Sequence, residues 1–84
     1  GTGPTTFWLR APKAATVSLL CSGNQWIPLE MARVGAGWWR ARTSLPAGTH
    51  EYVFVVDGAL LTPNAADVQV SDGFGGKNGV VEIR

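Results

Sequence analysis

The sequence predicts an all-β domain, a β-sandwich or small barrel of about seven short antiparallel strands. Three observations lead to this prediction. Five prolines and eleven glycines divide the 84 residues so regularly that no window is long enough for a stable helix. The segments between them are rich in Val, Thr and aromatic residues, as strands usually are. Several segments also alternate with the two-residue period of a strand.

Each expected strand follows a Pro, Gly or polar turn signal. In chain order, the expected strands are Thr5–Ala11, Ala15–Cys21, Leu29–Val34, Trp38–Thr43, Thr49–Val56, Ala66–Val70 and Val80–Arg84. Alternation in three of them assigns the sets headed by Phe7, Trp39 and Tyr52 to the core. Val53 and Val55 are then expected on an outer face, which would be less polar than a solvent-facing sheet usually is.

Two glycine-containing stretches predict turns. Asp57-Gly58 is typical of a tight hairpin turn. Residues 73–79, GFGGKNG, could suggest a phosphate-binding loop, but such loops lead into a helix whose N-terminus meets the anion. Here the following residues, Val80 to Ile83, have the composition of a strand. We therefore expect a hairpin-like bend that presents Phe74, Lys77 and Asn78.

Length and composition limit the function classes. A chain of 84 residues holds one domain and one core, so residues 1–84 are treated as a single domain. It begins at Gly1 rather than Met, as a domain excised from a longer protein would. The net charge of +1 argues against a nucleic acid or membrane partner, and no apolar run approaches the ~20 residues of a membrane helix. Cys21 is the one cysteine, which leaves no disulfide framework or metal cluster.

Catalytic residues are poorly supported, and no cofactor is expected. His50 is the single histidine and has no indicated partner, while the carboxylates are scattered over turns and strand ends. Trp38, Arg40 and Arg42 would share one strand face, which faintly resembles a nucleic-acid surface. A solvated face is the better interpretation at this net charge. The sequence therefore indicates a domain that is not an enzyme.

Trp26 ends the polar turn SGNQW, residues 22–26. One interpretation is structural, with the indole folded back over the end of the sandwich. The other is functional, with the indole as a flat surface for the apolar face of a sugar ring and polar side chains at its edge. Composition alone leaves both interpretations open.

The order of several motifs resembles the family-48 carbohydrate-binding modules, which include the glycogen-binding domain of the AMP-activated protein kinase β subunit. These motifs are FWLRAP (residues 7–12), VSL (17–19), SGNQW (22–26), GWW (37–39), LPAGTHEYVFVVDG (45–58) and DGFGGKNGVVEI (72–83). The resemblance covers nearly the whole chain. It implies an early-set immunoglobulin-like sandwich that binds α-glucan without catalysis.

The resemblance also implies which residues meet the sugar. Trp26 matches a stacking tryptophan, Asn78 a hydrogen-bonding asparagine, and Phe74 a position that presses into the glucan ring; Lys77 lies beside them. Three positions depart from the family pattern. Val53 replaces a lysine, Leu60 replaces a second tryptophan, and Gly76 replaces a hydroxyl residue. Weak binding is therefore expected. The alternative is an interaction module whose apolar Val53, Val55 and Leu60 pack against a neighbouring domain or partner protein.

Overall fold

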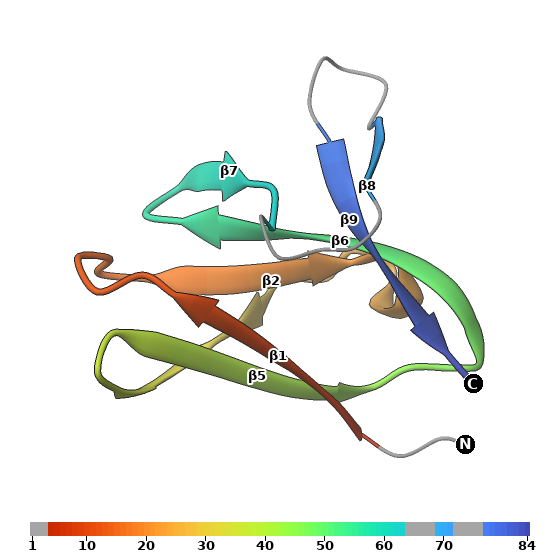
Figure 1. Ribbon diagram of the computed structural model, residues 1–84, viewed down its shortest axis with the longest axis horizontal. Coiled ribbons are helices and arrows are strands. Elements are labelled where there is room, and N and C mark those ends of the chain that lie inside the picture. Colours follow the sequence, from red (N-terminus) through yellow and green to blue (C-terminus); the bar gives the residue numbers. More distant parts are fainter. Residues whose placement is uncertain (1–3, 64–68, 72–76) are drawn as a thin grey trace.

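The computed structural model describes residues 4–63, 69–71 and 77–84, with the backbone alone for residues 69–71 and 77. The chain forms a sandwich of two antiparallel sheets (Figure 1). Its strands are β1 (Pro4–Arg10), β2 (Val17–Cys21), β3 (Leu29–Glu30), β4 (Ala32–Gly35), β5 (Trp38–Ser44), β6 (Gly48–Val56), β7 (Ala59–Leu61), β8 (Gln69–Ser71) and β9 (Lys77–Ile83). The one helical element of the described residues is a short 3₁₀ turn, η1 (Ser22–Asn24). The predicted all-β sandwich is confirmed.

The strand β6 organises the larger sheet. The smaller sheet has the order β1-β5-β4, and the larger one the order β3-β2-β6-β9-β8. On one side β6 pairs with β2 along residues 52–56. On its other side, β9 pairs with residues 48–52 and β7 with residues 54–56. Three strands, β2, β7 and β9, therefore pair with β6.

The core lies between the inner faces of the two sheets. Phe7, Trp39 and Ala41 contribute from the smaller sheet, and Leu19 and Phe54 from the larger sheet; all five are buried. Tyr52 joins the two sheets, because its ring makes edge-on contacts with Phe7 at 5.0 Å and with Phe54 at 5.9 Å between centroids. Edge-on aromatic pairs of this kind add to the stabilisation from burial. The faces predicted from alternation are confirmed for these strands.

The segment Leu29–Val34 does not form the single strand that was predicted. It divides at Met31 into β3, which pairs with β2, and β4, which pairs with β5 in the other sheet. The side chain of Met31 is buried in the core, and its amide donates to the carbonyl of Val17 at 2.9 Å. The chain crosses from one sheet to the other at this residue, which local sequence pattern does not reveal.

Asp57 and Gly58 form the predicted tight turn, with φ of 49° and 85°. Two positive φ values are typical of a two-residue hairpin turn, and Asp-Gly tolerates them well. The turn leads into β7, an edge strand that the sequence did not predict because its residues, ALL, do not alternate. β9 begins at Lys77, earlier than predicted, and pairs antiparallel with β8. The strands on both sides of residues 72–76 therefore form the expected hairpin.

Candidate functional site

Trp26 is carried by a loop that hydrogen bonds hold to the end of β2. The amide of Trp26 donates to the carbonyl of Cys21 at 2.9 Å, and the amide of Gln25 donates to the carbonyl of Ser22 at 3.2 Å. The indole of Trp26 is 42% exposed and is not part of the hydrophobic core. This geometry favours a surface function for the ring over a cap on the core.

The backbone conformation of this loop is unusual. Gln25 and Trp26 have φ of 62° and 60°, in the left-handed region that non-glycine residues seldom adopt. Each such residue costs about 1 kcal/mol or more, and residues of this kind often cluster at functional sites. The hydrogen bonds to Cys21 and Ser22 help to offset this cost and hold the backbone of the loop. The backbone thus fixes the point from which the Trp26 side chain projects.

Asn78 is linked to the same loop through β6. Its side-chain Nδ2 donates to Oε1 of Glu51 at 3.2 Å, and the backbone amide of Glu51 donates to Oγ of Ser22 at 2.9 Å. Ser22 lies four positions before Trp26. Sequence reasoning singled out Trp26 and Asn78 as candidates but did not single out Glu51 or Ser22. Alternation with Tyr52 places Glu51 on the outer face, yet its contact with Asn78 depends on the pairing of β6 with β9.

Gly79 fixes the backbone next to Asn78. It pairs with Tyr52 on β6, and a Cβ at this position would lie 2.7 Å from Cγ of the buried Pro63 and 3.1 Å from the Tyr52 ring. That space accommodates only a hydrogen atom, so glycine lets Pro63 pack against the inner side of β9. Because successive side chains on a strand point to opposite faces, Asn78 is directed to the outer face.

The outer face of β6 is an apolar strip. We use this name, the β6 outer face, for Leu20, Glu51, Val53, Val55, Leu60 and Asn78. Leu20 lies opposite Val53, and Leu60 lies opposite Val55, so each pair shares this face. Leu60 is 68% exposed and Val55 is half-buried.

The prediction that Val53 is exposed is wrong. Its side chain is on the outer side of the sheet, because Tyr52 and Phe54 point inward, but it is only 6% exposed. Val53 pairs with Leu20 of β2, and the residues next to it on β6 pair with β9 (Tyr52 with Gly79) and with β7 (Phe54 with Leu61). Neighbouring strands therefore cover it, and it contributes apolar packing beneath the surface.

The remaining predicted site residues are Phe74, Gly76 and Lys77. Phe74 and Gly76 are outside the described residues. Lys77 is the first residue of β9 and pairs with Ser71, but its side chain is outside the description. The structure thus places Val53, Leu60 and Asn78 on the larger sheet and Trp26 on the loop that follows β2.

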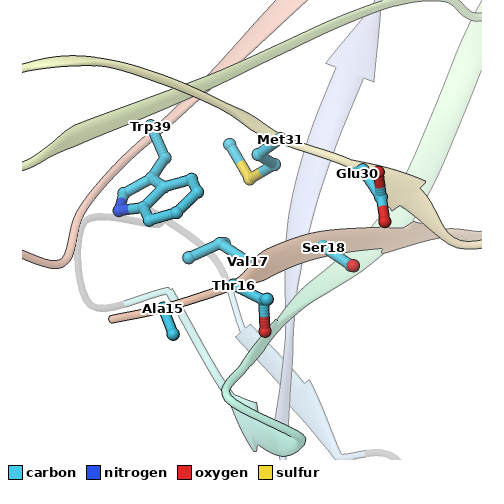
Figure 2. A pocket seen from close by; sticks show the side chains of 7 residues that line it. All are labelled: Ala15, Thr16, Val17, Ser18, Glu30, Met31 and Trp39. Atoms are coloured by element: carbon cyan, nitrogen blue, oxygen red, sulfur yellow. The ribbon is translucent and has the colours of Figure 1, made fainter. Parts of the chain in front are cut away.

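The hollows formed by the described residues are small and shallow. One of about 200 Å³ lies between β2 and the β3–β4 segment and is lined by Ala15, Thr16, Val17, Ser18, Glu30, Met31 and Trp39 (Figure 2). Ligand pockets usually have volumes of ~300–1,000 Å³. The indole of Trp39 is at its inner wall and is fixed by a 3.0 Å hydrogen bond from Nε1 to the Ala11 carbonyl. This hollow includes no predicted site residue, so the flat β6 outer face remains the candidate site.

Residues suited to catalysis are not brought together in the part of the chain that the structure describes. His50 Nε2 lies 2.7 Å from the Pro46 carbonyl, and its ring packs near Gly23. Cys21 is fully buried, and burial raises the pKa of its thiol, while a backbone hydrogen bond from Gly23 acts in the opposite direction. Within these same residues, no three or more His, Cys, Asp or Glu side chains gather as metal ligands would. No helix there is long and apolar enough to span a membrane.

A family model described as the glycogen recognition site of AMP-activated protein kinase matches residues 4–84. The chain belongs to this family. It is therefore a carbohydrate-binding module of the glycogen-recognition kind, a class of non-catalytic binding domain, and the resemblance seen in the sequence motifs is confirmed.

A solved structure with the same fold is the pullulanase from Bacillus acidopullulyticus, with a TM-score of 0.74 and 21% sequence identity. The match covers 99% of this module but only 11% of the pullulanase chain. At this identity the likeness is evidence for the fold alone. No curated protein matches the module.

Proposed function

We propose that the module binds an α-glucan chain across the β6 outer face, with Trp26 as the stacking surface. The observation that carries the proposal is the chain of contacts from the Trp26 loop through Ser22 and Glu51 to Asn78. It links the loop that carries an exposed indole to a side-chain amide on β9 of the larger sheet. Sugar recognition needs both, because a glucose ring has C–H groups on its faces and hydroxyls around its rim.

The spacing of these groups suits a short oligosaccharide. Cys21, at the end of β2, lies opposite Tyr52 on β6, and Tyr52 lies opposite Gly79 on β9. The base of the Trp26 loop on β2 and the part of β9 that carries Asn78 are therefore two strand spacings apart, a distance of about 10 Å. A glucan lying across β6 would meet the indole at one end and the Asn78 amide at the other. Phe74, in the loop before β9, would press against the same ligand.

The affinity should be low, because two positions on this face lack the groups that the family resemblance implies. Buried Val53 offers no donor, and Leu60 replaces a second indole. A hydrogen bond from a charged donor contributes about 1.5–3 kcal/mol and an aromatic stacking surface about 1 kcal/mol. Their loss together weakens binding about a hundredfold. We expect dissociation constants near the millimolar range for neutral maltooligosaccharides.

Titration with maltoheptaose tests the proposal. Binding is measured by tryptophan fluorescence or calorimetry. The Trp26→Ala variant should no longer respond to maltoheptaose. Trp38→Ala is a matched control, since the Trp38 indole is 41% exposed but belongs to the other sheet. It should bind maltoheptaose as the unchanged module does. An unchanged response in Trp26→Ala, or no response of the parent module at tens of millimolar, would reject glucan binding on this face.

The alternative function is docking to a neighbouring domain or partner protein through the same face. It is favoured by the apolar side chain of Leu60, which is 68% exposed and lies opposite Val55 on this face. Since Val53 is already buried within the module, the apolar surface available for docking is smaller than the sequence suggested. Amide hydrogen exchange, measured for the module alone and within its native assembly, tests whether this face docks to a partner. Protection of β7 only in the assembly supports docking, and equal exchange rates oppose it.

A further inference from the structure

Tryptophan and arginine side chains alternate on the outer face of the smaller sheet. Trp8 on β1 lies opposite Arg40 on β5, and Arg10 lies opposite Trp38. Arg42 follows on the same face of β5, opposite Thr6. We call these six residues, Thr6, Trp8, Arg10, Trp38, Arg40 and Arg42, the β1–β5 face. All six are exposed, and directly opposed residues on antiparallel strands have Cβ atoms about 4.5–5.5 Å apart. Aromatic planes and guanidinium groups are therefore immediate neighbours.

The β1–β5 face carries charge of one sign. The three strands of the smaller sheet, PTTFWLR, ARVG and WWRARTS, contain arginine but no Asp or Glu. One of these arginines, Arg33, is used internally: its guanidinium lies 4.8 Å from the Trp39 ring centroid and donates to the Ala14 carbonyl at 2.7 Å. Arg10, Arg40 and Arg42 remain on the outer face. Four of the seven Lys and Arg residues of the module therefore lie in these three strands.

The two indoles of this face are held nearly at right angles. The Trp8 and Trp38 rings are 6.5 Å apart between centroids with an interplanar angle of 86°, and the Arg40 guanidinium lies 5.9 Å from the Trp8 centroid. A groove of about 280 Å³ borders them at the side of the sandwich, between Trp8, Leu9, Arg10 and Trp38 of the smaller sheet and Phe54, Leu61, Thr62 and Pro63. This volume is slightly below the ~300 Å³ of the smallest usual ligand pockets, so the groove would hold a small ligand such as a single sugar unit.

We propose that the β1–β5 face binds a saccharide unit that carries a phosphate or carboxylate group. An indole covers one face of the sugar ring, and arginine forms paired hydrogen bonds to the anionic group, which its planar guanidinium matches. The uniform positive charge, with no carboxylate in the three strands, complements such a ligand. Single-stranded nucleic acid fits less well, because perpendicular indoles do not form a continuous surface for stacked bases. This site is separate from the β6 outer face and does not depend on glucan binding there.

Indole N–H signals in NMR spectra test the proposal directly, because each tryptophan reports on a different place. Trp8 and Trp38 report on the β1–β5 face, Trp26 reports on the proposed glucan face, and buried Trp39 reports on folding. Glucose 6-phosphate and glucuronic acid are titrated in parallel, with maltose and inorganic phosphate as comparison ligands at the same ionic strength. We expect one or both of the anionic sugars to shift Trp8 and Trp38 and to leave Trp39 unchanged. The stronger of the two identifies phosphate or carboxylate as the preferred group.

Charge variants provide the second part of the test. Arg40→Gln and Arg42→Gln should each weaken binding of the anionic sugar about tenfold, as expected for the loss of a charge-assisted hydrogen bond. Lys13→Gln is the matched control, because it removes the same charge from an exposed residue outside this face. Equal shifts of Trp8 and Trp38 with maltose, or equal shifts with inorganic phosphate alone, would overturn the proposal. So would tighter binding of a thymidine oligomer. Shifts of the Trp26 signal with maltoheptaose are measured in a separate titration. Either proposed site can therefore be rejected without affecting the test of the other.

Discussion

Asp57 and Thr16 are joined by two hydrogen bonds that run in opposite directions. The Thr16 amide donates to Oδ1 of Asp57 at 2.9 Å, and the Asp57 amide donates to the Thr16 carbonyl at 3.0 Å. Oδ1 also accepts from the Ala15 amide at 2.8 Å. The turn after β6 is thereby tied to the chain that enters β2. These bonds fix one end of the larger sheet and so the start of β7, which carries Leu60.

Asp57→Ala should destabilise the module by about 2 kcal/mol in chemical denaturation. The substitution removes an acceptor shared by two backbone amides. It also places alanine, which has no polar side chain to bond the local backbone, at a φ of 49° in the left-handed region. Asp57→Asn is the matched control, because asparagine retains an acceptor oxygen and tolerates this conformation. Equal losses of stability in both variants would show that the hydrogen bonds contribute little.

Glu51→Ala should weaken maltoheptaose binding about threefold to tenfold without unfolding the module. The carboxylate accepts from Nδ2 of Asn78, so its removal leaves the amide free to rotate away from the ligand. Glu51→Gln keeps an acceptor oxygen and should bind nearly as the parent does. Calorimetric titration of the two variants measures the difference. Identical affinities would mean that Asn78 does not need this contact.

Leu60→Trp should strengthen maltoheptaose binding about fivefold. Leu60 is the most exposed large apolar side chain among the described residues and lies opposite Val55 on the proposed glucan face. An indole there provides a second stacking surface worth about 1 kcal/mol. Leu60→Ala serves as the comparison and should change affinity little. If the gain in affinity from Leu60→Trp persists when Trp26 is replaced by Ala, the glucan bound at position 60 does not depend on Trp26, which contradicts the proposed site.

The stability of the module should fall as the pH rises above about 8.5, where an unfolded cysteine begins to lose its proton. Burial raises the pKa of the Cys21 thiol in the folded state, so the folded protein retains a proton that the unfolded chain releases. The stabilising contribution is complete below the unfolded pKa and is lost as pH rises through the folded pKa. Denaturation curves between pH 7 and 10 measure this effect.

Cys21→Ala isolates the contribution of the thiol to this pH dependence. The free energy of unfolding of the variant should fall less between pH 7 and 10 than that of the parent module, whatever its value at neutral pH. In the parent module the thiol should react with a disulfide reagent only slowly, because the side chain is fully buried. Rapid reaction in the native state, or the same alkaline decrease in the variant, would contradict this explanation.

Local sequence pattern was enough to predict which side chains face the core in the strands whose polar and apolar residues alternate. Phe7, Trp39 and Tyr52 headed the sets assigned to the core, and the structure places Phe7 and Trp39 in the core and packs Tyr52 against them. Asp57-Gly58 was assigned correctly because its conformation depends on these two residues themselves. In the candidate site, the motif SGNQW identified Trp26, but the fold was needed to show that its ring is exposed.

The sequence by itself determined the all-β class, the core-facing sets and the family, because each depends on residue order over short distances. Tertiary structure alone decided which strands are neighbours. It separated β3 from β4 at Met31, covered Val53 with the adjoining strands, and joined Asn78 to the Trp26 loop through Glu51. The physical reason is that burial and hydrogen-bond partners on a sheet depend on strands distant in sequence. A two-residue period reports the face of a residue but not its neighbours.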